Sequence, residues 1–320
     1  MPEIQDIAYW MALAHLPKWR TEKINSLIVE IIHNRRLSFA EFFELSEDDW
    51  QNEFQLNAKE SADLANVRSD LPELSLIAAA LREEGFEIIP INSSDYSETL
   101  KNNLKLRQSP PLLYIKGNKQ LLNESSVAIV GSRDASEIAL QFTDAVAKKC
   151  VEDYRVVVSG FAKGVDQLAL EATLKYHGRS IIVLPQGIMT FTGFRKYHSQ
   201  IVEGDVLILS TYFPKSPWNV GLAMGRNTYI YGLADEIYVA ESGSKGGTWS
   251  GVMDGLRKGR RIYVRKAESG EKNANNILLS KGAVPVDSEG NCIGEPVGPE
   301  TEQLEMKLGV SEEDDTRGGI

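Results

Sequence analysis

Small residues and basic side chains recur in short stretches of this sequence that each follow an apolar run. Three such stretches are Gly131-Ser132-Arg133, Ser159–Gly164 with its Lys163, and Ser242–Thr248. A glycine-rich turn at the start of a helix offers backbone N–H groups to an anion, and a nearby lysine or arginine adds positive charge. These residue types therefore predict sites for phosphate groups.

Two further dipeptides with basic residues extend this set, because Arg195-Lys196 follows the third apolar run and Arg226-Asn227, with one basic residue, comes after the fourth. Simpler readings stay open: Gly131 is also compatible with a plain turn and Arg133 with a solvated surface charge. The predicted phosphate-binding residues are Gly131, Ser132, Arg133, Ser159, Gly160, Lys163, Gly164, Arg195, Lys196, Arg226, Asn227, Ser242, Gly243, Ser244, Lys245, Gly246, Gly247 and Thr248.

Several other chemistries lack their sequence signatures. The sequence has no G-x-G-x-x-G dinucleotide fingerprint after the first strand, no Walker A loop and no G-x-S-x-G nucleophile elbow. Its only cysteines are Cys150 and Cys292, and His177 and His198 have no partner at metal-ligand spacing. We therefore expect no disulfide, no metal, no cofactor and no catalytic residues.

The elements that must position these residues are short apolar strands alternating with helices. This alternation predicts an α/β fold with an extended Rossmann-like, doubly wound and mostly parallel sheet, in which ligands bind at the carboxyl ends of the strands. Strand-like runs at Phe86–Ile91 and Leu112–Ile115 precede it. The expected strands are Val127–Val130, Val156–Ser159, Ile181–Leu184, Val206–Ser210, Ile237–Ala240, Ile262–Val264 and Ala283–Val286. The expected helices are Glu73–Glu84, Glu137–Val151, Val165–His177, Tyr197–Glu203, a stretch within Trp218–Leu233, and Trp249–Lys258.

The chain is expected to have three parts. We expect a small all-helical domain over residues 1–70 and the Rossmann-like domain over residues 71–287. We expect residues 288–320 to form an acidic, flexible tail with at most one helix near Thr301–Leu308. The helical domain carries many acidic residues, so docking to protein or stabilisation is favoured over contact with DNA. Its expected core is Trp10, Trp19, Phe39, Phe42, Phe43 and Trp50.

Charge is distributed unevenly along the 320 residues. The net charge is −10, yet residues 125–287 hold 20 basic and 16 acidic residues, giving +4, and the remainder gives −14. A mildly basic centre between acidic flanks is compatible with an anionic ligand. No apolar run is long enough for a membrane span, and Met1–Ala14 lacks the basic start of a signal peptide, so we expect a cytoplasmic protein.

Four motifs, taken in order along the chain, resemble those of the DprA/Smf family, DNA processing protein A. They are Val127–Arg133 (VAIVGSR), Ser159–Asp166 (SGFAKGVD), Arg226-Asn227 and Ser242–Ser244 (SGS). The resemblance spans about Glu73–Asp287 and includes the flanking segments Pro110–Gly117 and Asn276–Val286.

The resemblance implies a homodimer that binds single-stranded DNA in a basic pocket and passes the strand to a RecA-type recombinase. By motif, the implied phosphate contacts are Arg133, Lys163, Arg195 or Lys196, and Arg226. Binding of the DNA backbone by charged side chains and helix N-termini suits this role, because binding single-stranded DNA in this way requires little recognition of the bases.

The sequence also departs from the family pattern. Leu170 stands where the family usually has histidine, Thr228 where it usually has a second arginine, and Thr190–Tyr197 lacks a Tyr-Pro pair. We expect no winged helix at the C-terminal end. A divergent member of this kind is compatible with handling of foreign DNA, such as defence against phage.

The segment Lys245–Thr248 also resembles the glycine-rich loop of related nucleotide-binding proteins such as the LONELY GUY phosphoribohydrolases. Those proteins have a catalytic glutamate three residues after the threonine, and Gly251 stands at that position here. The leading hypothesis is a non-catalytic single-stranded DNA binding protein. The alternatives are a sensor or enzyme for a nucleotide-derived small ligand over residues 242–248, and a scaffold that docks partners through its acidic N-terminal region.

Overall fold

The computed structural model describes residues 3–296, so the helix expected near Thr301–Leu308 lies outside the described residues. The chain divides into two compact units. The first unit contains Met1–Glu124 and Arg179–Leu233, and the second contains Ser125–Gly178 and the chain from Ala234 onward. The helices before residue 70 and the first strands after it therefore belong to the same unit.

The second unit is built on five parallel strands in the order β4-β3-β7-β8-β9. All residues of β3, β4 and β8 are buried, which explains their continuous apolar sequences. The strands are β3 (Ser126–Val130), β4 (Val156–Ser159), β7 (Glu236–Val239), β8 (Ile262–Arg265) and β9 (Val284–Val286).

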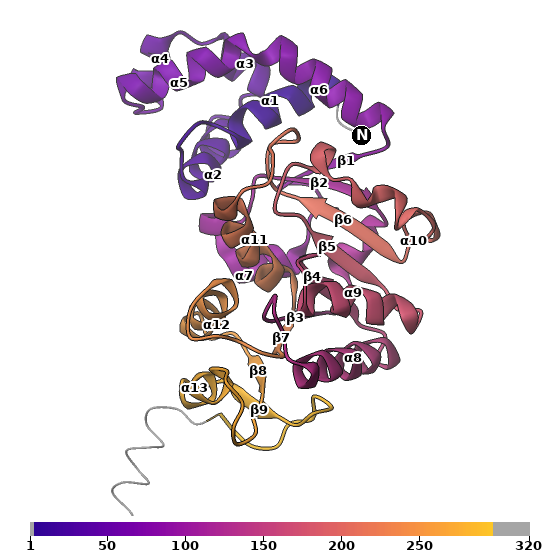
Figure 1. Cartoon of the computed structure of the whole chain (residues 1–320). Coiled ribbons are helices and arrows are strands. Elements are labelled where there is room, and N and C mark those ends of the chain that lie inside the picture. Colours follow the sequence, from indigo (N-terminus) through magenta and orange to yellow (C-terminus); the bar gives the residue numbers. More distant parts are fainter. Residues whose placement is uncertain (1–2, 297–320) are drawn as a thin grey trace, which may run out of the picture. The chain divides into compact units, whose positions relative to one another are not determined.

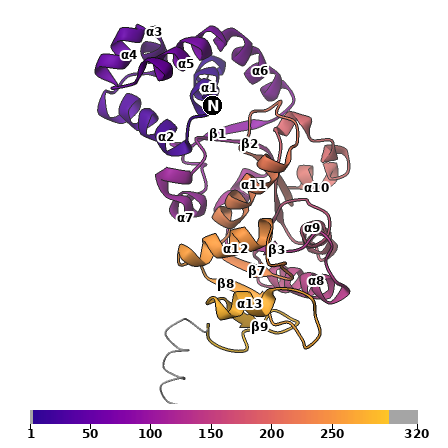
Figure 2. The ribbon, with the colours of Figure 1, turned by 60° about the vertical axis from the view of Figure 1, so that its left-hand side comes forward.

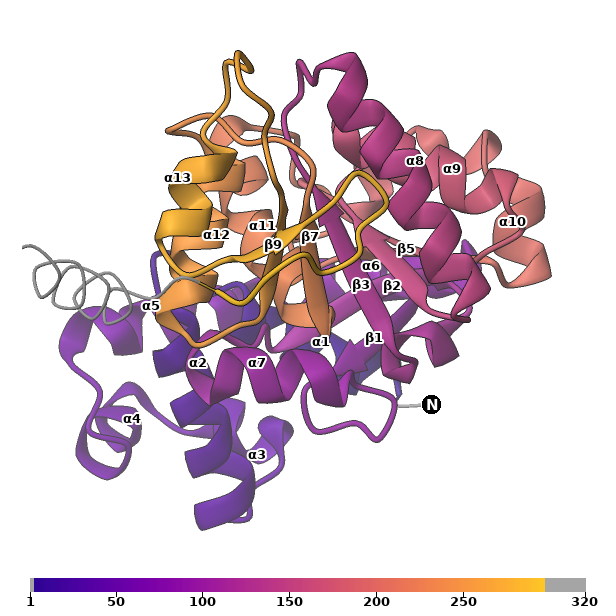
Figure 3. The ribbon, with the colours of Figure 1, turned by 90° about the horizontal axis from the view of Figure 1, so that it is seen from below.

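Helices cover both faces of these strands (Figure 3). α8 and α9 pack on each other and on β3 and β4, whereas α12 and α13 contact β8 from the other face. The doubly wound fold is thereby confirmed, although α13 was not predicted. The helices are α8 (Glu137–Glu152), α9 (Val165–Lys175), α12 (Gly247–Arg257) and α13 (Asn275–Ser280).

Four apolar residues of α8, namely Ile138, Phe142, Val146 and Cys150, follow one another at a spacing of four in the sequence. Phe142, Val146 and Cys150 are buried as their spacing predicts, but Ile138 is 40% exposed and Ala139 takes its place in the core. Ile138 lies in the first turn of α8. The four-residue repeat therefore fails only at its first position.

The chain order creates a switch point between β3 and β7. From β3 the chain passes through α8 to β4 on one side, and it later returns to β7 on the other side of β3 (Figure 1). Open α/β sheets bind ligands outside the carboxyl ends of strands at such a point. The loops after β3 and β7 are therefore the first place to look for a site.

The first unit holds the strands β1 (Glu87–Pro90), β2 (Leu112–Gly117), β6 (Val206–Ser210) and β5 (Ser180–Val183), in that spatial order. β1 pairs antiparallel with β2 and β2 antiparallel with β6, whereas β5 and β6 are parallel. With the five parallel strands of the second unit, this confirms a mostly parallel α/β fold.

Helices α1 to α6 of the first unit gather together, with α1 packed along α6 (Figure 2). This contact means that a chain cut at residue 70 would expose the buried side of α6. α7 was not predicted, and no helix among residues 3–296 is long and apolar enough to cross a membrane. The helices are α1 (Ile4–Ala14), α2 (Thr21–Val29), α3 (Phe39–Glu44), α4 (Glu47–Glu53), α5 (Ala58–Ser69), α6 (Leu71–Glu83), α7 (Glu98–Gln108), α10 (His198–Glu203) and α11 (Val220–Leu233).

Local signals explain the short N-terminal helices. Capping boxes begin α3, α4 and α5, in which Ser38, Ser46 and Asn57 accept from the backbone three residues later. The expected aromatic core is buried except at Trp19, which is half-buried and donates its indole N–H to Asp63 at 3.0 Å.

Candidate functional site

The loops after β3 and β4 touch so closely that two glycines are required. A Cβ on Gly131 would lie 2.5 Å from the Val165 side chain, and one on Gly164 would lie 2.4 Å from the carbonyl oxygen of Ser132. Gly164 also has a φ of +86°, a conformation that side chains disfavour. The N–H of Val165 donates to the Ser132 oxygen at 3.2 Å, which locks the two loops together.

The loop after β7 joins them on the other side of the switch point. The N–H of Ser132 donates to the Glu241 carbonyl at 2.9 Å, and the Thr248 hydroxyl donates to the Gly131 carbonyl at 3.0 Å. The structure therefore brings together three predicted stretches, 131–133, 159–164 and 242–248, in one unit. We call this loop cluster the rim, defined as residues 131–136, 159–165 and 241–248.

The rim carries three exposed cations, one from each loop: Arg133, Lys163 and Lys245. The Lys163 ammonium lies 3.1 Å from the Asp134 carboxylate, and both side chains are strongly exposed, at 79% and 87%. An exposed pair of this kind contributes about 0–1 kcal/mol to stability. It therefore leaves Lys163 available to a competing anion.

The three helices that start at the rim differ in how their first N–H groups are used. At α9 the N–H groups of Val165 and Gln167 bond to loop carbonyls, so this turn offers fewer donors than its sequence suggests. α12 begins after Gly246 without a side-chain cap, and the space where a Gly246 Cβ would stand is open. At α8, by contrast, the Ser136 hydroxyl caps the helix. The glycine-rich start of α12 is thus the most open of the three.

Two predicted serines are structural in this geometry. Ser159 is 2% exposed and donates its hydroxyl to the Ile129 carbonyl at 3.1 Å. Ser242 is fully buried, and its hydroxyl donates to the Gly243 carbonyl. Each hydroxyl therefore satisfies a neighbouring backbone oxygen.

A buried polar group beneath the glycine-rich loop was missed by sequence reasoning. The Asn275 side-chain oxygen accepts from Ser242 N–H at 2.9 Å, and its amide donates to the carbonyls of Ala240 and Arg265. The Arg265 guanidinium, 3% exposed, pairs bidentately with Glu271 at 2.9 and 2.5 Å. Hydrogen bonding from Arg265 lowers the pKa of Glu271 to about 2. The only available signal was the asparagine-rich stretch 273–276 after β8, which has no distinctive spacing.

The remaining predicted residues belong to the first unit. Arg195 and Lys196 are exposed, with the Lys196 ammonium 5.1 Å from the centre of the Tyr197 ring. Arg226 is only 3% exposed and donates to the Val183 carbonyl at 3.0 Å. Asn227 is half-buried on α11.

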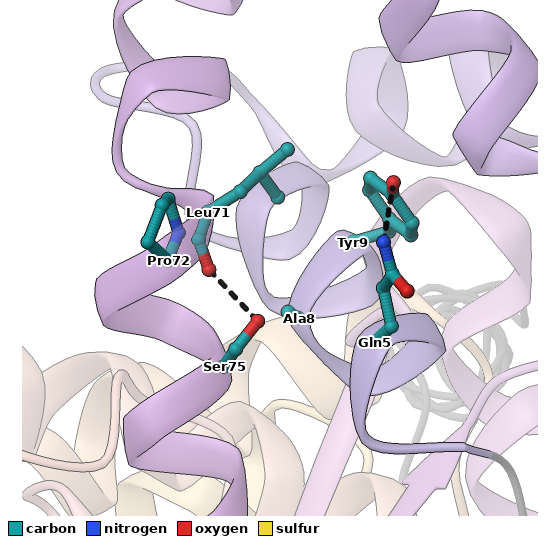
Figure 4. A pocket seen from close by; sticks show the side chains of 6 residues that line it. All are labelled: Gln5, Ala8, Tyr9, Leu71, Pro72 and Ser75. Carbon is teal, nitrogen blue, oxygen red and sulfur yellow. Dashed lines mark hydrogen bonds between the residues drawn. The ribbon is translucent and has the colours of Figure 1, made fainter.

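A separate pocket of about 260 Å³ lies between α1 and α6 (Figure 4). Its polar groups bond locally, Gln5 to the Tyr9 hydroxyl at 3.3 Å and the Ser75 hydroxyl to the Leu71 carbonyl at 3.0 Å. None of the predicted site residues lines it. This pocket therefore has no part in the rim.

The family model for DNA recombination-mediator protein A matches residues 87–295, which include the whole rim. The chain belongs to the DNA recombination-mediator protein A family. This confirms the family that the four motifs indicated, DprA/Smf.

Relatives of this recombination-mediator family are similar over part of the chain. The DNA processing protein DprA of Bacillus subtilis is 28% identical over 60% of this chain, and the match spans 65% of that protein, just under two thirds of its length. DprA of Streptococcus pneumoniae is 30% identical over 60% of this chain and 68% of its own length.

Solved structures of the recombination-mediator family share the fold. The S. pneumoniae DprA structure has a TM-score of 0.66 at 24% identity and covers 90% of this chain and 96% of that one. A Helicobacter pylori DprA structure, described for its single-stranded DNA binding mode, has a TM-score of 0.53 at 24% identity and covers 69% of this chain and 96% of that one. These likenesses establish the fold.

Proposed function

We propose that this chain binds single-stranded DNA through its phosphate backbone at the rim. The observation that carries the proposal is the hydrogen-bonded junction of three loops at the switch point, which gathers three exposed cations and the uncapped start of α12. Family membership and the DNA-binding mode described for the H. pylori protein support the same ligand. Contacts of this type bind the backbone without selecting a sequence.

The same proposal treats the rim as non-catalytic. The Thr248 hydroxyl is committed to the Gly131 carbonyl, and Gly251 brings no carboxylate to the first turns of α12. Burial raises the pKa of the Cys150 thiol to about 12, so this cysteine stays protonated and is no nucleophile.

Further parts of the proposal concern the setting of the protein. By its family, it passes the strand to a RecA-type recombinase or to other DNA-processing machinery, acts as a homodimer and works in the cytoplasm, with defence against phage as one pathway. Arg195, Lys196 and Arg226 remain predicted phosphate contacts in the first unit, of which Arg226 would have to leave the Val183 carbonyl.

A second candidate ligand is a small nucleotide derivative bound over residues 242–248. Its support is the open space around Gly246, whose φ of +101° leaves the loop backbone accessible at the helix start. A nucleotide would use this one loop, whereas a DNA strand would use all three loops of the rim.

The deciding experiment is a titration of the full chain with an oligothymidine, a duplex and a mononucleotide at two salt concentrations. We expect the oligothymidine to bind most tightly and to weaken steeply as salt increases, because each neutralised phosphate releases counterions. Tight, salt-insensitive binding of the mononucleotide alone would favour the second candidate. Absence of any binding to the oligothymidine would contradict the proposal.

A further inference from the structure

The start of α8 already holds an anion that belongs to the protein. One carboxylate oxygen of Glu241 accepts hydrogen bonds from the Ser136 backbone N–H at 3.2 Å and from the Ser136 hydroxyl at 2.5 Å. Ser136 is the N-cap of α8, and its hydroxyl accepts in turn from Ala139 N–H. A carboxylate at this place is stabilised by the positive end of the helix.

This carboxylate lies within the rim rather than beside it. The backbone oxygen of Glu241 holds Ser132, and Ser132 and Arg133 connect directly to the loop that ends at Ser136. A second internal carboxylate, Asp134, pairs with Lys163 in the same loop cluster. Protein carboxylates thus contact both a helix-start donor group and a cation of the proposed DNA site.

We propose that Glu241 is an affinity-setting residue, whose carboxylate occupies the Ser136 donors as a substitute anion and is displaced when a DNA phosphate binds the rim. The proposal rests on the proposed function. The DNA phosphate and the Glu241 carboxylate compete for the Ser136 donors. The phosphate must replace the hydrogen bonds that the carboxylate makes and overcome the repulsion from the carboxylate's negative charge. A chain that brings several phosphates can offset this cost, so Glu241 favours polyanions over single small anions.

The test replaces the charge and keeps the shape. Glu241→Gln retains a carbonyl oxygen that can accept from Ser136, so the loop keeps its geometry while the negative charge is lost. Glu137→Gln is the matched control, because Glu137 is the next residue after Ser136 and is exposed, but makes no hydrogen bond or ion pair within residues 3–296. Both variants lose one unit of charge near the same helix start.

Affinity for an oligothymidine and thermal unfolding are measured for the full chain of wild type and of both variants at about 0.15 M salt, where exposed charges are screened beyond about 8 Å. We expect Glu241→Gln to bind about fivefold more tightly, from the usual strength of a charge at a helix start, and to unfold at a lower temperature because the cap is weakened. Glu137→Gln should bind within about twofold of wild type.

The possible outcomes distinguish a failure of the displacement by phosphate from a failure of DNA binding at the rim. Tighter binding together with a lower unfolding temperature, found in Glu241→Gln alone, supports displacement of the Glu241 carboxylate by phosphate. If Glu241→Gln binds the oligothymidine as tightly as wild type or more weakly, Glu241 is only a structural cap. If Glu137→Gln tightens binding as much as Glu241→Gln does, the effect is one of general electrostatics. Either result overturns this inference. Wild type that fails to bind the oligothymidine would overturn the proposed function instead.

Discussion

At the scale of residues, the rim depends on positions where no side chain fits. Gly164 combines a positive φ with a backbone oxygen 2.4 Å from its missing Cβ, whereas Gly259 has a φ of +70° and no atom within 4 Å. Both glycines relieve backbone strain, but only Gly164 also permits contact between the loops after β3 and β4. Gly259 is thus required only for the backbone conformation, whereas Gly164 is also required for the contact between the two loops.

Gly164→Ala should therefore destabilise the protein by about 3 kcal/mol, from backbone strain plus overpacking, and should weaken oligothymidine binding as the two loops separate. Gly259→Ala is the matched control and should cost about 1 kcal/mol. Urea unfolding measures both values. Equal losses in the two variants would show that the loops do not constrain each other at Gly164.

At the scale of elements, a histidine joins α1 to the strands of the first unit. His15 lies at the end of α1, its ring nitrogen is 2.8 Å from the Tyr114 hydroxyl of β2, and its ring stacks on Tyr114 and meets Phe213 edge-on. Although some of the residue remains accessible, enclosure of the ring lowers the pKa of His15 from 6.5 to about 4. The folded state therefore favours the neutral form of the His15 imidazole.

Because the unfolded chain takes up this proton at a higher pH than the folded protein, His15 should reduce stability as the pH falls from about 6.5 towards 4. The unfolding free energy of wild type should therefore fall over this interval more than that of His15→Gln, which has no proton to take up. Urea unfolding at several pH values measures the difference. Identical pH profiles would mean that His15 is not held neutral.

Strand positions were predictable because continuous β-branched runs leave few alternatives, and β4 and β6 agree with their predicted bounds. The rim was predictable in outline because the carboxyl ends of parallel strands share one edge. α7 was missed because Glu98–Gln108 is largely polar, and the Asn275 support was missed because its partners come from β8 and the loop after β7. Burial of Arg226 could not be read from its motif, since it depends on the end of β5.

At the scale of the whole molecule, the proposed DNA binding depends on one loop cluster, the rim. An overall charge of −10 opposes DNA binding, so the attraction must come from local cations and helix starts. Affinity should consequently depend strongly on salt and on a few residues of the rim. Cations elsewhere in the same unit should contribute little.

The most direct test is the salt dependence of oligothymidine binding for Arg133→Ala, Lys163→Ala and Lys258→Ala. Lys258 serves as the control because it follows α12 at the end opposite the glycine-rich loop, roughly 16 Å along the helix, and pairs with Asp254. We expect weaker binding for the two rim variants and a log–log salt slope smaller in magnitude by roughly 0.7 for each lost phosphate contact, with Lys258→Ala unchanged. Loss of binding in Lys258→Ala, with Arg133→Ala and Lys163→Ala equal to wild type, would contradict DNA binding at the rim.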